Sequence, residues 1–277
     1  MNLCLAKIAA WLGLSVPEPL EITGVSIDTR SLQPGNLFVA LRGTRVDGHD
    51  FMSDAIKRGA AAILCIDAAP ALTVPVLQYP DLEKALALIA TGYRAQLTCQ
   101  VVALTGSNGK TTVKEMLGAI LGEDAFVTPG NLNNHLGVPL SVLQVKPSNQ
   151  NTAIELGANH VGEIAYTAAI VKPHVALINN IGSAHIEGFG SMDNIARAKG
   201  EIYESLSSEG TAVVNADDKY AHFWDNLIAK KQKICFSSVN KNAALYAENI
   251  KITPSGGAAF KLIKGRETCN ITLDVPG

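Results

Sequence analysis

The chain has 277 residues, of which 47% are hydrophobic, 17% charged and only 5% aromatic, and its formal net charge is −2. This composition supports an aliphatic core, and the length is typical of two domains. The lack of a basic surplus argues against nucleic acid as a partner, and no apolar run approaches the roughly 18 residues of a membrane span. Five scattered cysteines without a C-x-x-C pair are typical of reduced thiols in the cytoplasm.

Residues 1–80 are predicted to form a small α/β domain. Apolar residues from Leu5 to Leu12 repeat at helical spacing, which favours an amphipathic first helix over a signal peptide. Short apolar runs separated by turn residues predict strands at 22–27, 37–41, 61–66 and 74–78. The helix period of residues 81–97 predicts a linker helix to the next domain.

Residues 98–277 are predicted to form a central domain in which strands and helices alternate. Strands are expected at 101–104, 152–156, 174–179 and 212–215, and one helix should end at Lys172, before Pro173. This order predicts an α/β fold with a mostly parallel sheet and helices on both faces. After about residue 233, short runs on either side of Gly256 and Gly257 predict a small antiparallel patch.

A glycine-rich segment lies between the strand at 101–104 and the helix that follows it. Its glycines allow a tight turn, and a helix N-terminus adds partial positive charge, so the backbone can receive phosphate groups. Lys110 can reach the β- and γ-phosphates of ATP, and the Thr111 hydroxyl can bind Mg²⁺. Leu104 stands where the general pattern G-x-x-x-x-G-K-[ST] requires glycine, so a glycine-rich turn with an unrelated lysine is the alternative. The predicted phosphate-binding loop (P-loop) consists of Gly106, Ser107, Asn108, Gly109, Lys110, Thr111 and Thr112.

This loop resembles the ATP loop of the Mur ligases and their folylpolyglutamate synthase relatives. Other segments match the same family in order: 130–139 (GNLNNHLGVP), 155–160 (ELGANH), 184–185, 198–201 (AKGE) and 215–218 (NADD). Segments 26–31 and 47–51 resemble the family's uridine-nucleotide domain. The resemblance covers nearly the whole chain and implies a cytoplasmic, ATP-dependent carbon–nitrogen ligase of peptidoglycan precursor synthesis. The segments GNLNN and ELGANHVGEI point to the step that joins D-alanyl-D-alanine to UDP-N-acetylmuramoyl-tripeptide.

The resemblance also implies a mechanism and its catalytic residues. A substrate carboxylate attacks the γ-phosphate of ATP, and the amine then attacks the resulting acyl phosphate. Two Mg²⁺ ions are expected, with Thr111 and Glu155 as ligands of one. His185 and Lys199 are expected at the second, and Lys110, Glu155, His185 and Lys199 form the expected catalytic set. From the residues alone, Glu155 could instead be a solvated loop carboxylate and His185 a hydrogen-bonding loop histidine.

Lys199 is unusual because helical spacing places it on an apolar stripe with Ile195 and Ile202, whereas Arg197, Glu201 and Glu204 point away. A lysine on a buried face is costly unless it is paired or neutral. The resemblance implies carbamylation by CO₂, which would turn the amine into a carboxylate-like metal ligand. The alternative is a buried stem whose ammonium reaches solvent.

The remaining candidates are expected to bind substrate or nucleotide. Asn133 and Asn134 would position the substrate or the γ-phosphate, or they are turn asparagines. Asn215, Asp217 and Asp218 would line the nucleotide edge, unless an acid caps a helix. Thr29, Arg30, Ser31 and His49 are candidates for the uridine diphosphate, because the Arg30 fork suits two oxygens, with a plain surface loop as the alternative.

Three other functions remain open. The chain could serve another Mur ligase stage or a folylpolyglutamate-synthase-like reaction, or it could be a P-loop kinase that needs no amine acceptor. It could also be a non-catalytic nucleotide-binding module. The segment at 275–277 resembles a motif late in the family's central domain, so the family's third domain is expected to lie beyond this chain. The corresponding hypothesis is that the isolated chain binds UDP-substrate, or ATP weakly, and turns nothing over.

Overall fold

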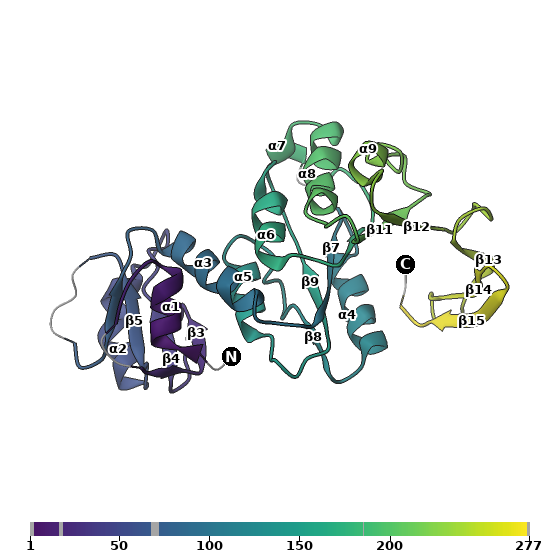
Figure 1. The fold of residues 1–277 in the computed structure, drawn as a ribbon. Coiled ribbons are helices and arrows are strands. Elements are labelled where there is room, and N and C mark those ends of the chain that lie inside the picture. The colour runs from purple at the N-terminus through teal and green to yellow at the C-terminus, as the bar shows by residue number, and fades with distance from the viewer. Residues whose placement is uncertain (1–2, 17–18, 68–71, 185, 276–277) are drawn as a thin grey trace. The chain divides into compact units, whose positions relative to one another are not determined.

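The computed structural model describes residues 3–16, 19–67, 72–184 and 186–275 (Figure 1). Contacts group the chain into two compact units. One comprises Met1–Gln100, Glu115–Glu155 and Ala169–Val171, and the other comprises Val101–Lys114, Leu156–Ala168 and Lys172–Gly277. Each unit draws on separate stretches of chain, so the units do not follow the predicted boundaries one to one.

The first unit contains a four-stranded parallel sheet in the order β3-β4-β5-β6. Every residue of β4 and β5 is buried, as in parallel strands covered on both faces. The predicted strands at 37–41, 61–66 and 74–78 and the first helix are confirmed, whereas the run at 22–27 divides into two short strands. The elements are β1 (Leu3–Cys4), α1 (Leu5–Trp11), β2 (Glu21–Ile22), β3 (Gly24–Ser26), β4 (Asn36–Val39), η1 (Gly48–Phe51), α2 (Met52–Lys57), β5 (Ala62–Cys65) and β6 (Val76–Gln78).

Helix α3 (Leu82–Arg94) confirms the helix predicted at 81–97. It begins where the Asp81 side chain accepts a hydrogen bond from Lys84 N, a regular N-cap. The same unit contains the parallel pair β8 (Ala125–Val127) and β9 (Asn151–Glu155), and the helix α5 (Gly137–Gln144). Sequence patterns missed β8, which has three residues, and α5, which carries Pro139 in its first turn, where a missing N–H is tolerated.

The second unit contains parallel strands in the order β7-β10-β11-β12, which confirms the predicted parallel sheet. These strands are β7 (Gln100–Thr105), β10 (Val175–Ile178), β11 (Thr211–Asn215) and β12 (Gln232–Ser237). Helices α4 (Lys110–Leu121) and α6 (Glu163–Val171) run between parts of the chain assigned to different units, whereas α7 (Ile186–Phe189), α8 (Met192–Glu204) and α9 (Asp225–Ile228) lie in the second (Figure 1). Lys172 adopts a left-handed conformation after α6, so that helix ends as predicted.

The predicted antiparallel patch is also confirmed. Strands β13 (Leu245–Ile252), β14 (Ala258–Lys264) and β15 (Glu267–Leu273) pair antiparallel, and β13 joins β12 in parallel (Figure 1, yellow). Gly256, with φ +84°, lies in the turn between β13 and β14. Of the helices that the structure describes, none combines the length and the apolar character needed to cross a membrane.

Candidate active site

The predicted phosphate-binding loop runs from the end of β7 to the start of α4, in the second unit. Gly109 has φ +73°, which favours glycine. At Gly106, a Cβ atom would lie 3.0 Å from the Asn179 side chain, so this position needs a residue without a side chain. The backbone turns at these two glycines and enters α4, where Val113 N donates to Gly109 O at 3.0 Å. The amides ahead of Val113 therefore stand at the open end of a helix.

The connection that follows β10 holds this loop in place. Ser107 N donates to Asn180 O at 2.9 Å, and Asn108 N donates to Asn180 Oδ1 at 2.9 Å. Asn179 Nδ2 and Asn180 Nδ2 both donate to Asn108 O. Ser107 Oγ donates to Gly182 O at 3.0 Å and accepts from Gly182 N at 2.8 Å. The amides of Ser107 and Asn108 thus stabilise the conformation of the loop. The amides at the start of α4 are the ones left to face a ligand.

Two lysines converge on one carbonyl of this loop. Lys110 Nζ donates to Gly106 O at 2.9 Å, and Lys199 Nζ donates to the same oxygen at 3.1 Å. Two ammonium groups at one carbonyl repel each other unless an anion accompanies them. Their convergence therefore marks this loop as a place where negative charge is favourable.

Lys199 comes from the middle of α8 and is only 2% exposed, so the alternative in which its ammonium reaches solvent is wrong. Burial, and then the charge of Lys110, lowers the pKa of Lys199 from its ordinary value of 10.5 to about 8. Gly200 allows Trp224 to pack closely on this helix, and the Trp224 indole donates to Ala196 O at 2.9 Å.

The residues of the loop fit the phosphates of a nucleotide. The side chain of Thr105, directly before Gly106, is fully buried, and its Oγ1 is an oxygen without a hydrogen-bond partner among the described residues. An unpaired buried hydroxyl calls for a ligand or an ordered water. Among the residues that the structure describes, no group of three or more His, Cys, Asp or Glu side chains is arranged for a metal. Mg²⁺ usually combines one or two protein oxygens with phosphate and water, and the Thr111 hydroxyl and the Glu155 carboxylate are oxygen ligands of that kind.

Glu155 ends β9 in the first unit and is 1% exposed, so the alternative of a solvated loop carboxylate is wrong. Its Oε1 accepts from Asn133 Nδ2 at 2.7 Å, and its own amide donates to Thr128 Oγ1 at 2.9 Å. Asn134 has a different role, because its Oδ1 accepts from Gly137 N at 2.7 Å at the start of α5. Asn133 is therefore the hydrogen-bond partner of the Glu155 carboxylate, and Asn134 is a turn residue.

Asn215 ends β11 in the second unit, and Asp217 and Asp218 follow that strand; all three bind neighbouring loops. Asn215 Nδ2 donates to Asn179 O, and Asp218 Oδ2 accepts from Ile181 N at 2.6 Å. Asp217 Oδ2 accepts from Ser238 N and Oγ, and hydrogen bonds including these lower its pKa despite the opposing effect of burial. Both acids lie in a turn and not at a helix N-cap. Asn215 and Asp218 thereby support the connection that holds the phosphate loop.

A cavity of about 540 Å³ lies in the first unit, and Thr29 and Arg30 are among the residues that line it. Arg42 adds a second cation, whereas Val46 and Phe51 expose 55% and 39% of their surface. The carboxylates of Asp28 and Glu83 also line the cavity, and Arg30 is paired with Asp28 at 2.6 Å. This mixture of charged and apolar side chains suits a polar ligand that carries a flat ring.

Two further candidates, Ser31 and His49, are not among the residues that line this cavity. Ser31 Oγ donates to Asp28 O. His49 Nε2 accepts from Ile66 N at 3.1 Å, so its proton is on Nδ1, which bonds Asp47 Oδ1 at 2.6 Å. Both ring nitrogens of His49 thus hold the protein's own backbone and side chains together.

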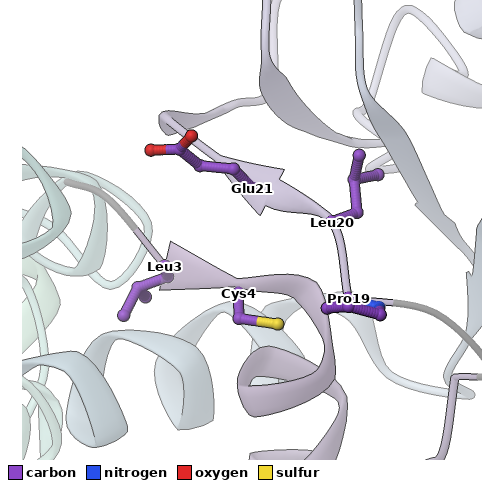
Figure 2. A pocket seen from close by; sticks show the side chains of 5 residues that line it. All are labelled: Leu3, Cys4, Pro19, Leu20 and Glu21. Carbon is purple, nitrogen blue, oxygen red and sulfur yellow. The ribbon is translucent and has the colours of Figure 1, made fainter.

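A second cavity, of about 340 Å³, lies beside the β1–β2 pair and is mainly apolar. Figure 2 shows the Cys4 sulfur directed toward Pro19, while the Glu21 carboxylate points away. None of the predicted site residues lines this second cavity. His185, the expected ligand of a second metal, lies outside the described residues.

Sequence reasoning missed three residues that shape the site. Asn179 and Asn180 clamp the phosphate loop, but asparagines after a strand are ordinary turn residues, so they gave little signal. Glu201 was expected to point away from the apolar stripe of α8 that carries Lys199, but the sequence did not show that the face it occupies is also buried, with Glu201 only 7% exposed. Its carboxylate accepts from Gly162 N and Ala165 N at the start of α6.

Comparisons with known proteins show the family of this chain. The family model "Mur ligase middle domain" matches residues 104–277, and "Mur ligase family, catalytic domain" matches residues 21–94. The chain is 42% identical over 260 residues to UDP-N-acetylmuramoyl-tripeptide–D-alanyl-D-alanine ligase of Escherichia coli K12, covering 93% of this chain and 57% of that protein. It therefore spans little more than half the length of that relative.

Solved structures of Mur ligases have the same fold as this chain. A crystal structure of MurF from Acinetobacter baumannii superposes with a TM-score of 0.91 at 34% identity, covering 100% of this chain and 62% of that one. MurF ligase from Thermotoga maritima, solved in complex with ADP, gives a TM-score of 0.79 at 28% identity over 90% of this chain and 57% of that one. With a family model over most of its length and a relative that is 42% identical over 93% of it, the chain belongs to the Mur ligase family.

Proposed function

We propose that this chain binds ATP at the loop from Gly106 to Thr112 and serves the ligation of D-alanyl-D-alanine to UDP-N-acetylmuramoyl-tripeptide. The observation that carries the proposal is the convergence of Lys110 and Lys199 on the Gly106 carbonyl, beside the open end of α4. The choice of substrates is supported by the names of the relatives, which are ligases of this specificity.

The reaction begins when the terminal carboxylate of the tripeptide attacks the γ-phosphorus of ATP. The bond to the bridging oxygen breaks, which releases ADP and leaves an acyl phosphate. The amine of D-alanyl-D-alanine then attacks the acyl carbon, phosphate leaves with the electron pair, and the amine loses a proton. Because an anion must approach a polyanion, cations have to neutralise the phosphates. Lys110 and the amides at the start of α4 supply that charge in this chain.

Mg²⁺ would add further positive charge at the phosphates and polarise them for attack. Thr111 and Glu155 are the residues proposed to hold one ion, and His185 and Lys199 are proposed for a second. Asn133 would then act through Glu155, because its amide occupies one carboxylate oxygen and so fixes the direction of the other.

Lys199 is proposed to react with CO₂. Its lowered pKa of about 8 leaves a larger neutral fraction near neutral pH than an exposed lysine has, and only the neutral amine attacks CO₂. The nitrogen–carbon bond forms, one proton leaves, and the product is a carbamate anion. Lys110, close enough to lower this pKa, would then face an anion in place of a second cation.

The cavity of the first unit is proposed to bind the uridine diphosphate end of the substrate, with residues 1–80 as its domain. Arg30 lines the cavity and would bind the diphosphate together with Thr29, while Ser31 and His49 hold the surrounding turns. Asn134 is proposed to stabilise the turn that leads into α5. Asn215, Asp217 and Asp218 would support the nucleotide edge through the loops they bind. All five cysteines are free thiols, which fits a cytoplasmic location.

Calorimetry with ADP and Mg²⁺ tests the nucleotide site. Lys110→Ala should weaken ADP binding about tenfold or more, the value of a charge-assisted hydrogen bond, whereas the exposed Lys264→Ala should not. Equal affinity in Lys110→Ala and the wild type would refute the assignment of the loop.

ADP release with UDP-N-acetylmuramoyl-tripeptide, with and without D-alanyl-D-alanine, tests the reaction. Product that depends on the amine acceptor supports a ligase, whereas sustained ADP release without it would favour a kinase.

A further inference from the structure

Helix α8 makes polar contacts in two opposite directions. Lys199 reaches the Gly106 carbonyl, and Glu201, two residues later, reaches the start of α6. Residues two apart on a helix project about 200° from each other, so these side chains leave opposite faces. The helix therefore links the phosphate loop to the segment that follows β9.

The Glu201 end of this link is short, charged and buried. Oε1 accepts from Gly162 N at 2.6 Å, and Oε2 accepts from Ala165 N at 2.8 Å. Both amides stand at the beginning of α6, where no helical carbonyl is available to them, and a carboxylate is favoured there by the helix dipole. Gly162 has φ +95°, so the chain turns sharply at the point that Glu201 holds.

The segment between β9 and α6 begins at Leu156, whose amide donates to Leu104 O at 2.8 Å. Glu155 directly precedes Leu156 in the chain. One end of the segment is thus fixed beside β7, one residue from Glu155, and the other end is fixed by Glu201. Asn159 N, between them, donates to Glu163 Oε2 at 2.7 Å, so the segment has little freedom left.

We propose that Glu201 is a positioning residue that ties the start of α6 to the helix of Lys199, so that Lys199, a proposed metal ligand, keeps its place at the Gly106 carbonyl. This inference rests on the proposed function, because it concerns the Mg²⁺ site of that reaction. Glu201 itself touches neither nucleotide nor metal.

Two variants each remove one of the hydrogen bonds between Glu201 and the start of α6. Glu201→Gln replaces an acceptor oxygen with an NH₂ group that cannot accept. Ala165→Pro deletes the donor N–H and leaves Glu201 intact, and Ala165 is exposed and in the first turn of α6, where proline is tolerated. Glu204→Gln, at an exposed position of α8, controls for the loss of one negative charge. Trp224 fluorescence, read in a Trp11→Phe background, verifies that each variant is folded.

Amide hydrogen exchange measured by NMR is the first readout. Exchange at Gly162 should accelerate about tenfold or more in Glu201→Gln, and its neighbours Val161 and Glu163 should loosen in both Glu201→Gln and Ala165→Pro, but not in Glu204→Gln. Unchanged exchange in both test variants would overturn the proposal.

ADP binding with and without Mg²⁺ is the second readout. Both test variants should lose about tenfold in the apparent affinity for Mg²⁺ in the ADP complex and should bind metal-free ADP as the wild type does. Faster exchange with unchanged Mg²⁺ affinity would overturn the positioning role and leave Glu201 as a purely structural contact. A wild-type chain that binds no ADP would instead refute the proposed function.

Discussion

The buried ammonium of Lys199 makes the stability of the second unit depend on pH in a direction that can be worked out. The pKa of Lys199 is about 8 in the folded chain and 10.5 in an ordinary environment. Below pH 8 both states hold the proton, and the folded state bears the full cost of the buried charge. Between the two values the unfolded chain binds more protons, so stability rises with pH.

The size of this rise follows from the same interval. At about 1.4 kcal/mol per pH unit, relieving the buried charge is worth about 3 kcal/mol in total, most of it gained before about pH 10. Burial raises the pKa of Tyr203 above its ordinary value of 10.0, so the contribution of Tyr203 to stability declines only above about pH 10. Burial also lowers the pKa of Lys231, so between about pH 7.5 and 10 the effect of Lys199 is isolated by the difference between the wild type and a Lys199 variant.

Lys199→Met keeps the length of the side chain and removes the charge. The variant should be more stable than the wild type near neutral pH, and the gap should shrink by about 2 kcal/mol toward pH 10. Urea unfolding in CO₂-free buffer measures this gap. Trp224 fluorescence reports the second unit once the only other tryptophan is removed by Trp11→Phe. Lys264→Met, at an exposed site, controls for the loss of one positive charge. A gap that stays constant over this range would refute the reasoning.

Three further outcomes are expected. Asn133→Ala should cost about 1–3 kcal/mol in urea unfolding, because it leaves an oxygen of the buried Glu155 carboxylate without its amide donor. Gly200→Ala should cost about 1–3 kcal/mol and shift the emission of Trp224, because a Cβ there would lie 2.7 Å from the indole; an unchanged midpoint would contradict this. Arg30→Ala should weaken UDP binding in calorimetry about tenfold while leaving thermal unfolding nearly unchanged, since the side chain is exposed.

The features that sequence predicted well are those set by local pattern. Glycine spacing located the turn between the buried strand β7 and the helix α4, and the 3.6-residue period placed Lys199 on a buried face of α8. The parallel strand order followed from alternating strands and helices, because that order restricts the possible connections.

The features that sequence did not predict depend on contacts between distant segments. Glu201 lies on the face of α8 opposite to Lys199, and a helical period cannot show that the start of α6 covers that face. His49 has the chemistry of a ligand, yet Asp47 and the Ile66 amide use both ring nitrogens. Asn180 is one of many asparagines in turns, and only the folded chain shows that it faces the backbone of Asn108.

The hydrogen bonds from Asn180 to Ser107 and Asn108 have a consequence for affinity. They order the loop during folding, so an arriving nucleotide meets a preorganised receptor and loses little of its binding energy to restricting the loop. The side chain of Asn180 bonds only the backbone of the loop in this structure. Asn180→Ala should nevertheless weaken nucleotide binding, because the empty loop would then adopt more conformations. Nucleotide affinity would then depend on an asparagine that need not contact phosphate.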